Sequence, residues 1–240
     1  MRTSIAAALC LASASAFAQN AAPPAPKDPL VGTVALGYLA TSGNTDSTNA
    51  NASFKATWDR GRDWIHNWSA LAISARSNGV LTAEAYAAGY KAQRAFGMNA
   101  YLFASGDWRE DQFSGYDRQA TEAVGYGRKL VNTERQMLSV EGGLGAKQST
   151  LINGTDVNEG VVRGGLDYLI HLGENSQFTQ KLLIEVGDQN RYTESTSAVK
   201  AKIRGNLALV ASYIIKNNSD VPVGIEKTDR FTAISLEYGF

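Results

Sequence analysis

Hydrophobic and polar residues alternate along much of this chain, most clearly in its last twelve residues, DRFTAISLEYGF (229–240). One parity holds Thr232, Ile234, Leu236, Tyr238 and Phe240, and the other holds Ala233, Ser235, Glu237 and Gly239. Successive side chains of a strand point to opposite faces, so this pattern predicts a strand with one apolar and one small or polar face. The chain ends on the apolar face with the aromatic Phe240, which favours apolar surroundings outside that face.

Clusters of Gly, Asn, Asp and Ser recur roughly every 15 residues and divide the rest of the chain into similar segments. With these clusters taken as turns, the sequence predicts about twelve strands. Their expected ranges are 31–41, 46–60, 62–76, 81–96, 98–112, 117–131, 134–148, 157–171, 176–190, 194–204, 206–217 and 229–240. Several exceed the length usual in soluble sheets and match membrane strands, and the stretch from Val31 to Val221 contains no proline.

Alternation does not by itself say which face of a strand looks inward. A soluble barrel would bury residues such as Leu209 and Leu236, whereas a membrane barrel would turn them toward lipid. Two predicted strands, 62–76 and 98–112, do not alternate cleanly, so their faces stay unassigned.

Turn lengths and aromatic residues favour the membrane barrel. Tight turns expected at 60–62, 96–99, 132–134, 173–175 and 204–206 alternate with longer segments at 41–45, 112–116, 149–156 and 217–228. Trp58, Trp64, Phe96 and Tyr238 fall near the tight turns, where an interfacial aromatic girdle is expected. No apolar run approaches a membrane-spanning helix. We therefore predict an all-β, antiparallel up-and-down transmembrane β-barrel of about twelve strands over residues 30–240.

The first residues predict export. Residues 1–18 combine Arg2, an apolar core over 5–11 and the small-x-small sequence Ala16-Phe17-Ala18, as in a cleaved secretory signal peptide. Residues 19–29 hold four of the five prolines and are expected to form a linker. Cleavage would remove the single cysteine, so the mature chain would have neither a disulfide nor a cysteine nucleophile.

The charges predict the character of the lumen. The chain has 23 basic and 23 acidic residues, and cleavage of the signal peptide would remove one basic residue, Arg2, which leaves a net charge of −1. This balance implies no nucleic-acid partner. The ionisable residues expected to line the lumen are Lys181, Glu185, Lys200, Lys202, Arg204 and Glu237. Such residues either set the ion selectivity of a pore or pair across strands and plug it. The basic stripe of Lys200, Lys202 and Arg204 beside Lys181 is the part expected to attract anions.

Several segments carry a family resemblance. The sequence SGNTDSTN at 42–49, the stretch 212–222 with KNNSDVP, EKTD at 226–229 and the terminal LEYGF resemble the YdiY-like family of salt-induced outer-membrane proteins. The resemblance covers nearly all of the mature chain and implies an outer-membrane barrel linked to salt or osmotic stress, without catalytic residues to transfer. An aromatic C-terminus also resembles that of other bacterial outer-membrane barrels, which implies that Phe240 is a signal to the barrel insertion machinery.

Catalytic and metal sites have little support in the sequence. A lipid hydrolase would need a histidine, and only His66 and His171 are available, both expected near the short-turn ends of their strands. No HExxH, GxSxG or P-loop spacing occurs. We expect a non-enzymatic outer-membrane barrel, without cofactor or metal, in contact with membrane lipid, that is either a small-solute or ion channel or a structural envelope protein. An outer-membrane lipid hydrolase and a soluble periplasmic ligand-binding barrel remain the alternatives.

Overall fold

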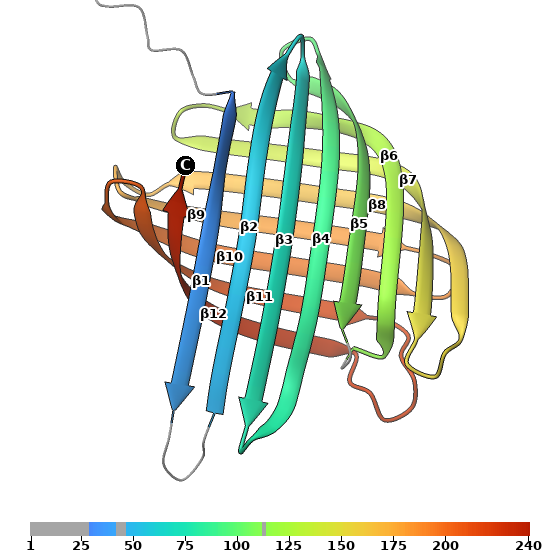
Figure 1. Cartoon of the computed structure of the whole chain (residues 1–240). Helices are drawn as coiled ribbons and strands as arrows, with labels where there is room; N and C mark the ends of the chain where they lie inside the picture. The colour runs from blue at the N-terminus through green and yellow to red at the C-terminus, as the bar shows by residue number, and fades with distance from the viewer. Residues whose placement is uncertain (1–28, 42–46, 112–113) are drawn as a thin grey trace, which may run out of the picture.

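The computed structural model describes residues 29–41, 47–111 and 114–240, and in these ranges twelve antiparallel strands form a closed barrel (Figure 1). Each strand is hydrogen-bonded to its neighbours in the chain, and β1 closes on β12. The strands are β1 Leu30–Thr41, β2 Ser47–Gly61, β3 Trp64–Ser77, β4 Val80–Phe96, β5 Ala100–Asp111, β6 Tyr116–Asn132, β7 Gln136–Leu151, β8 Asp156–His171, β9 Ser176–Val186, β10 Arg191–Arg204, β11 Leu207–Asn218 and β12 Thr228–Gly239. The predicted fold class is confirmed. The signal peptide and nearly all of the linker lie outside the described residues.

Two walls make up the barrel. Strands β1 to β5 form the front wall in Figure 1, strands β8 to β12 cross behind them at a steep angle, and β6 and β7 curve between the walls. None of the described segments is a helix long and apolar enough to cross a membrane.

The two ends of the barrel differ. The end that we call the terminal end carries the start of β1, the C-terminus and the turns at 62–63, 97–99, 133–135, 172–175 and 205–206. The opposite end, called the loop end, carries among others the turns at 78–79, 152–155 and 187–190 and the loop 219–227.

Several expected strand boundaries differ from the structure, and three of them have a clear local cause. The expected loop at 149–156 is a shorter turn, because the two strands that flank it extend to Leu151 and Asp156. The strand expected to reach 190 ends at Val186, since the amide of Gly187 bonds to the carbonyl of Asn190 at 3.0 Å and closes a turn. The strand expected to start at 62 starts at Trp64 because the two preceding residues have positive φ.

Closure of the barrel depends on a short seam between β1 and β12. Residues Thr33–Leu36 pair with Leu236–Gly239. Beyond them, Gly32 and Phe240 exchange two backbone hydrogen bonds of 2.9 Å each. The side chain of Phe240 packs over Gly32, where a Cβ atom would overlap the ring. The C-terminal residue is therefore part of the seam itself.

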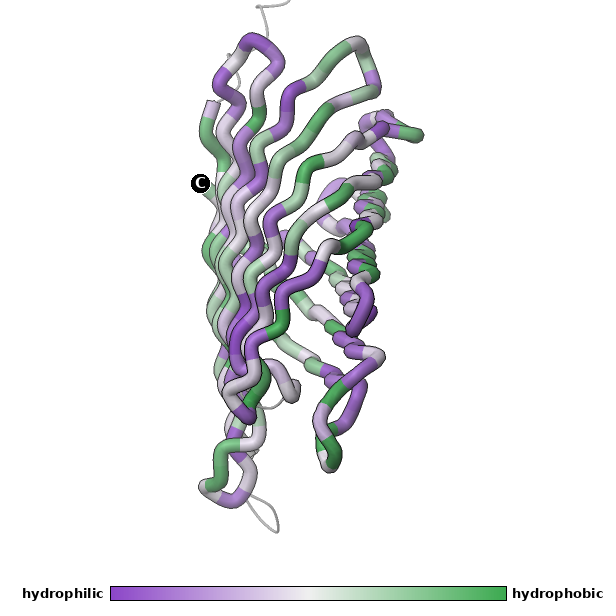
Figure 2. Tube along the Cα trace, turned by 90° about the vertical axis from the view of Figure 1, so that its right-hand side faces the viewer, coloured by the Kyte–Doolittle hydropathy of each residue, from purple (hydrophilic) through white to green (hydrophobic). Residues whose placement is uncertain are grey.

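Burial decides which face of the strands looks inward. Large apolar side chains stand exposed on the outside, among them Leu36 (63%), Leu209 (45%) and Leu236 (48%). Charged residues are enclosed, with Glu185 at 0% and Lys147 at 1%. Figure 2 shows the resulting alternation of hydropathy along the strands. The polarity is the reverse of a soluble barrel and matches a barrel that faces lipid.

Glycines make room for two aromatic rings inside the lumen. Tyr101 and Phe103 of β5 are almost fully buried. They lie over Gly125 and Gly127 of β6, and a Cβ atom on either glycine would meet one of these rings in overlap. Gly142 of β7 lies in the outward-facing register and has open space where its Cβ would be.

This arrangement predicts a difference between two glycine variants. Gly127→Val should lower the free energy of unfolding by roughly 1–3 kcal/mol, because the ring of Tyr101 would be forced from its position. Gly142→Val is the matched control and should have little effect, since its side chain meets no neighbour. Denaturant unfolding of the detergent-refolded barrels measures both. Equal unfolding midpoints would contradict the packing described here.

Candidate functional site

The lumen holds a cluster of charges centred on Glu185 of β9. Its carboxylate accepts hydrogen bonds from Arg163 at 3.0 Å, from Lys147 at 3.3 Å, and from two nitrogens of Arg109 at 3.3 Å each. Arg163 also donates to Asp107 at 2.6 Å. The cluster thus joins β5, β7, β8 and β9. Three cations surround one carboxylate, with a second carboxylate at the edge.

Burial imposes a desolvation cost on the charges of this cluster. The side chain of Glu185 is fully enclosed, and the side chains of Lys147 and Arg163 are 1% and 9% exposed. The guanidinium of Arg109 lies 4.4 Å from the centre of the Tyr192 ring, in cation–π contact. Ions removed from water are tolerated only when opposite charges and hydrogen bonds replace the solvent. Each member of the cluster therefore depends on the others.

A second ion pair crosses the lumen near the loop end. Lys216 of β11 lies 3.6 Å from Asp111 of β5, and both side chains are about 10% exposed. In the strand order of the closed barrel, β5 and β11 are on opposite sides. A pocket of ≈ 290 Å³ lies beside this pair on the side of β2, β3 and β12, lined in part by Asn51, Asp111 and Asp229. On the other side, the space lined in part by Arg109, Tyr192 and Lys216 is only ≈ 10 Å³. That is room for about one water molecule.

The loop 219–227 adds a cover at the loop end. The carbonyl of Asp220 accepts a 3.2 Å hydrogen bond from the hydroxyl of Tyr116, which begins β6 on the other side of the barrel. The Pro222 ring lies next to Gly115. At the base of the loop, Asn190 donates to Asn218 at 2.8 Å. The loop end therefore carries a loop, an ion pair and a buried charge cluster in succession, each of which links opposite or distant strands across the lumen.

Glu141 of β7 forms a smaller centre in the middle of the lumen. It accepts hydrogen bonds from Lys91 of β4 at 2.7 and 2.8 Å and from the hydroxyl of Tyr101 at 2.9 Å. These contacts pass over the glycine-lined inner face of β6, so they bind the front wall to the curved part of the barrel.

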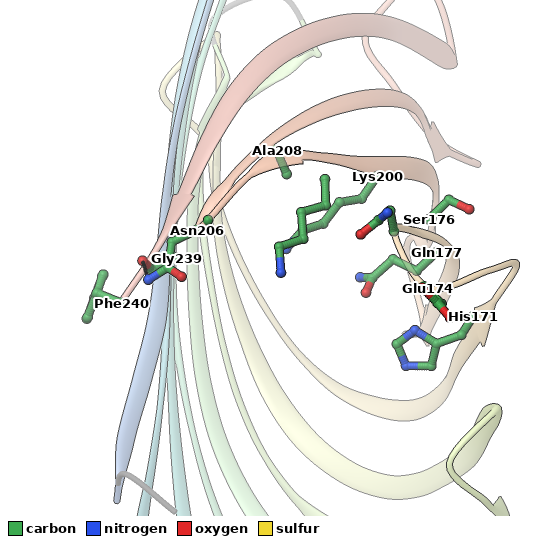
Figure 3. A pocket seen from close by; sticks show the side chains of 12 residues that line it. His171, Glu174, Ser176, Gln177, Lys200, Asn206, Ala208, Gly239 and Phe240 are labelled. Carbon is green, nitrogen blue, oxygen red and sulfur yellow. Dashed lines mark hydrogen bonds between the residues drawn. The ribbon is translucent and has the colours of Figure 1, made fainter.

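The terminal half of the lumen is more open. Lys181 pairs with Asp167 at 3.0 Å, and both side chains are substantially exposed. Lys200 pairs with Glu237 at 2.6 Å, from β10 to β12. A cavity of ≈ 380 Å³, which we call the vestibule, lies at this end beside Lys200 and Lys202 (Figure 3).

The six charges expected in the lumen are placed in different settings. Glu185 lies in the buried cluster, whereas Lys181, Lys200 and Glu237 form the exposed or partly exposed pairs of the terminal half. Lys202 is paired in register with Ala208, and Arg204 with Leu207, so a register shift separates the two. Leu207 in turn faces Tyr238, an exposed residue of the outer face. The expected stripe is thus interrupted between Lys202 and Arg204.

Sequence reasoning missed the partners of Glu185 on β5. Asp107, Arg109 and Asp111 share one parity, which is a polar signal in the sequence. The aromatic Tyr101 and Phe103 share that same parity, so the strand showed no consistent apolar face. The polar parity from residue 105 onward indicated an inward face, but the two aromatic residues of the same parity at the start of the strand obscured it.

The residues expected to form an aromatic girdle lie on the outside near the terminal end. Trp58, Trp64, Phe96 and Tyr238 are all exposed, between 37% and 56%. That they mark a membrane interface stays a prediction.

The two histidines lie in different surroundings. His66 stacks beside Trp64 and Trp68, and its Nδ1 lies 2.8 Å from the Tyr90 hydroxyl on the outer face. His171 lines the vestibule on the inner side, so the two histidines are separated by the barrel wall. Within the described ranges, no group of three or more His, Cys, Asp or Glu side chains is placed to hold a metal ion.

The buried cluster predicts a large effect of neutralising its central carboxylate. Glu185→Gln would leave three enclosed cations with too little negative charge, and should lower the free energy of unfolding by about 3–5 kcal/mol. Glu134→Gln, in an exposed turn, is the control and should leave it unchanged. Denaturant titration followed by tryptophan fluorescence compares them, and a mild effect of Glu185→Gln would contradict mutual dependence in the cluster.

Comparison with solved structures supports the fold. The NanC porin superposes with a TM-score of 0.51 at 12% identity, covering 87% of this chain and 97% of the porin. An outer membrane channel from Pseudomonas putida F1 superposes with a TM-score of 0.54 at 9% identity, covering 90% of this chain and 99% of that one. At such low identity these likenesses concern the fold alone.

Comparison of sequences gives the family. The uncharacterized protein YdiY of Escherichia coli strain K12 is 30% identical over 217 residues, which cover 90% of this chain and 85% of YdiY. The model of a family described as "Protein of unknown function, DUF481" matches residues 34–240, from β1 to the C-terminus. The chain therefore belongs to the DUF481 family.

Proposed function

We propose that this protein is a non-enzymatic barrel of the bacterial outer membrane that is closed at its loop end at rest and passes small ions or solutes when that closure loosens. The closure, which we call the ion-pair gate, consists of Asp107, Arg109, Asp111, Lys147, Arg163, Glu185 and Lys216. The observation that carries the proposal is the ion pair between Asp111 and Lys216, because it joins opposite sides of the barrel directly across the lumen.

Several observations support an outer-membrane location. The outer face carries exposed apolar side chains while ions are enclosed, which suits lipid and not water. The fold is shared with a porin and with an outer membrane channel. Export by a cleaved signal peptide at 1–18 and recognition of Phe240 by the barrel insertion machinery belong to the same proposal.

A gate made of ion pairs suggests a link to salt. Raising the ionic strength from 0.1 M to 1 M shortens the Debye length from about 10 Å to about 3 Å, which weakens charge pairs that water can reach. Asp111 and Lys216, each about 10% exposed, are open to this effect, whereas the fully enclosed Glu185 is less so. High salt would therefore loosen the gate from its loop side.

The alternatives have less support. A lipid hydrolase would need a histidine hydrogen-bonded to a nucleophile, but among the described residues His66 bonds to Tyr90, and His171 makes no hydrogen bond to Ser176 or Glu174, which line the same cavity. A soluble ligand-binding barrel would bury residues such as Leu209 and Leu236, which are exposed. A permanently plugged structural barrel differs from the proposed one only in whether the gate opens, and conductance decides this.

Removing the crossing pair should open the barrel. In planar bilayers the wild type should show rare, small conductance steps at 0.1 M KCl, which become more frequent at 1 M. Asp111→Asn with Lys216→Gln removes both charges, so that neither buried ion is left unpaired, and should give steps several-fold larger.

The matched control removes a pair that does not cross the lumen. The pair between Asp167 and Lys181 joins the neighbouring strands β8 and β9 only. Its removal by Asp167→Asn with Lys181→Gln should leave the step size close to that of the wild type. If all three proteins are folded and heat-modifiable but silent at both salt concentrations, the gate proposal fails and the structural barrel is favoured.

A further inference from the structure

The vestibule at the terminal end has the size and position of a binding site. Its volume of ≈ 380 Å³ falls in the range of small-molecule pockets, and it opens at the end of the barrel away from the ion-pair gate. The residues that provide polar groups are His171, Ser176, Gln177, Lys200, Lys202 and Asn206, from the ends of strands β8 to β10 and the adjoining turn. Figure 3 shows Lys200, Gln177 and His171 around one space, with the Phe240 ring directed away from it.

Positive charge exceeds negative charge in this half of the lumen. Four lysines face it from the front and back walls, namely Lys55, Lys181, Lys200 and Lys202. The carboxylates are Asp167 and Glu237, with Glu174 in the turn at the rim. Glu141, which is within electrostatic range of Lys181, is itself paired with Lys91 and leaves this balance unchanged.

Two of these lysines, Lys55 and Lys202, have no ion-pair partner among the described residues. Asp167 is paired with Lys181, and Glu237 with Lys200. Among the described residues, no carboxylate lies within 4.0 Å of the ammonium of Lys55 or Lys202. Lys55 lies within electrostatic range of Lys181 and Lys200, which repel it, and of Glu237 and Asp167, which attract it and are already paired with those two lysines. A bound anion would relieve that repulsion.

Hydrogen-bond donors accompany the charge. Lys200 lies opposite Gln177 in the β9–β10 ladder, and Gln177 lies opposite His171 in the β8–β9 ladder. An amide, an imidazole and an ammonium group therefore stand in one row across three strands, beside Lys202. Oxyanions such as carboxylates and phosphates accept hydrogen bonds from all of these groups.

We propose that the vestibule binds a small oxyanion that carries carboxylate or phosphate groups, with Lys202 as its principal charge partner and Lys200 and Gln177 as further donors. This inference deepens the proposed function, because it names the class of solute that the barrel would hold before the gate. Binding itself needs no opening of the gate, so the two can be tested separately.

The register shift in β10 provides an internal control. Lys202 and Arg204 are two residues apart in an apparently continuous basic stripe. The shift leaves Lys202 beside the vestibule, whereas Arg204 pairs with Leu207 and does not line the cavity. An anion held by the vestibule should therefore depend on Lys202 and not on Arg204, although the two residues carry the same charge.

The experiment is ligand-observed NMR on the full mature chain refolded in zwitterionic detergent, with citrate, inorganic phosphate and neutral glucose as probes. The wild type should bind citrate or phosphate with a Kd on the order of 1 mM and should not bind glucose. Lys202→Met should weaken binding roughly three- to tenfold, and Glu174→Gln should strengthen it, because one variant removes attraction and the other removes repulsion.

Arg204→Met is the matched control and should bind like the wild type. Citrate bound without phosphate would assign the site to carboxylates, and the reverse would assign it to phosphates. The proposal is overturned if folded wild type binds neither anion, or if Arg204→Met weakens binding as much as Lys202→Met. A barrel that binds anions but never conducts would support the anion site and contradict the gate. A barrel that conducts without binding anions would support the gate and contradict the anion site.

Discussion

Closure of the sheet is the constraint on which the rest of this structure depends. Backbone amides and carbonyls that face lipid have no water to bond, so every strand edge must be paired. The seam between β1 and β12 provides this, and it is short: four register pairs and the reciprocal bonds between Gly32 and Phe240. Because a Cβ atom at Gly32 would overlap the ring of Phe240, the fit of the last residue depends on the absence of a side chain in the first strand.

Once the barrel closes with its apolar face outward, its interior must accommodate charges. The two halves of the lumen do so differently. In the loop half, the ions are enclosed and satisfy one another, around Glu185 and between Asp111 and Lys216, and they draw opposite walls together. In the terminal half, lysines outnumber nearby acids and the space stays open. The same inward polarity thus links opposite walls in one half and leaves a charged recess in the other.

The strand plan and the closed antiparallel fold could be predicted from sequence, because two-residue alternation and turn residues are local signals. The faces of β3 and β5 could not. On β5 the inward parity begins with Tyr101 and Phe103 and continues with Asp107, Arg109 and Asp111, so neither parity is consistently apolar. The rings fit inside only because β6 offers glycines beneath them, and this depends on a neighbouring strand.

The sequence by itself determined the number of strands, their approximate limits and the residues that share a face, since these follow from local geometry. Tertiary structure decided the rest. Burial confirms the inward polar face that turn lengths and aromatic residues favoured, but a register shift that no spacing reveals separates Lys202 from Arg204. Asp111 and Lys216 meet because closure brings β5 and β11 to opposite sides of one narrow lumen. Contacts across a lumen depend on its width and on the stagger of its strands, and neither property is encoded in a short segment of sequence.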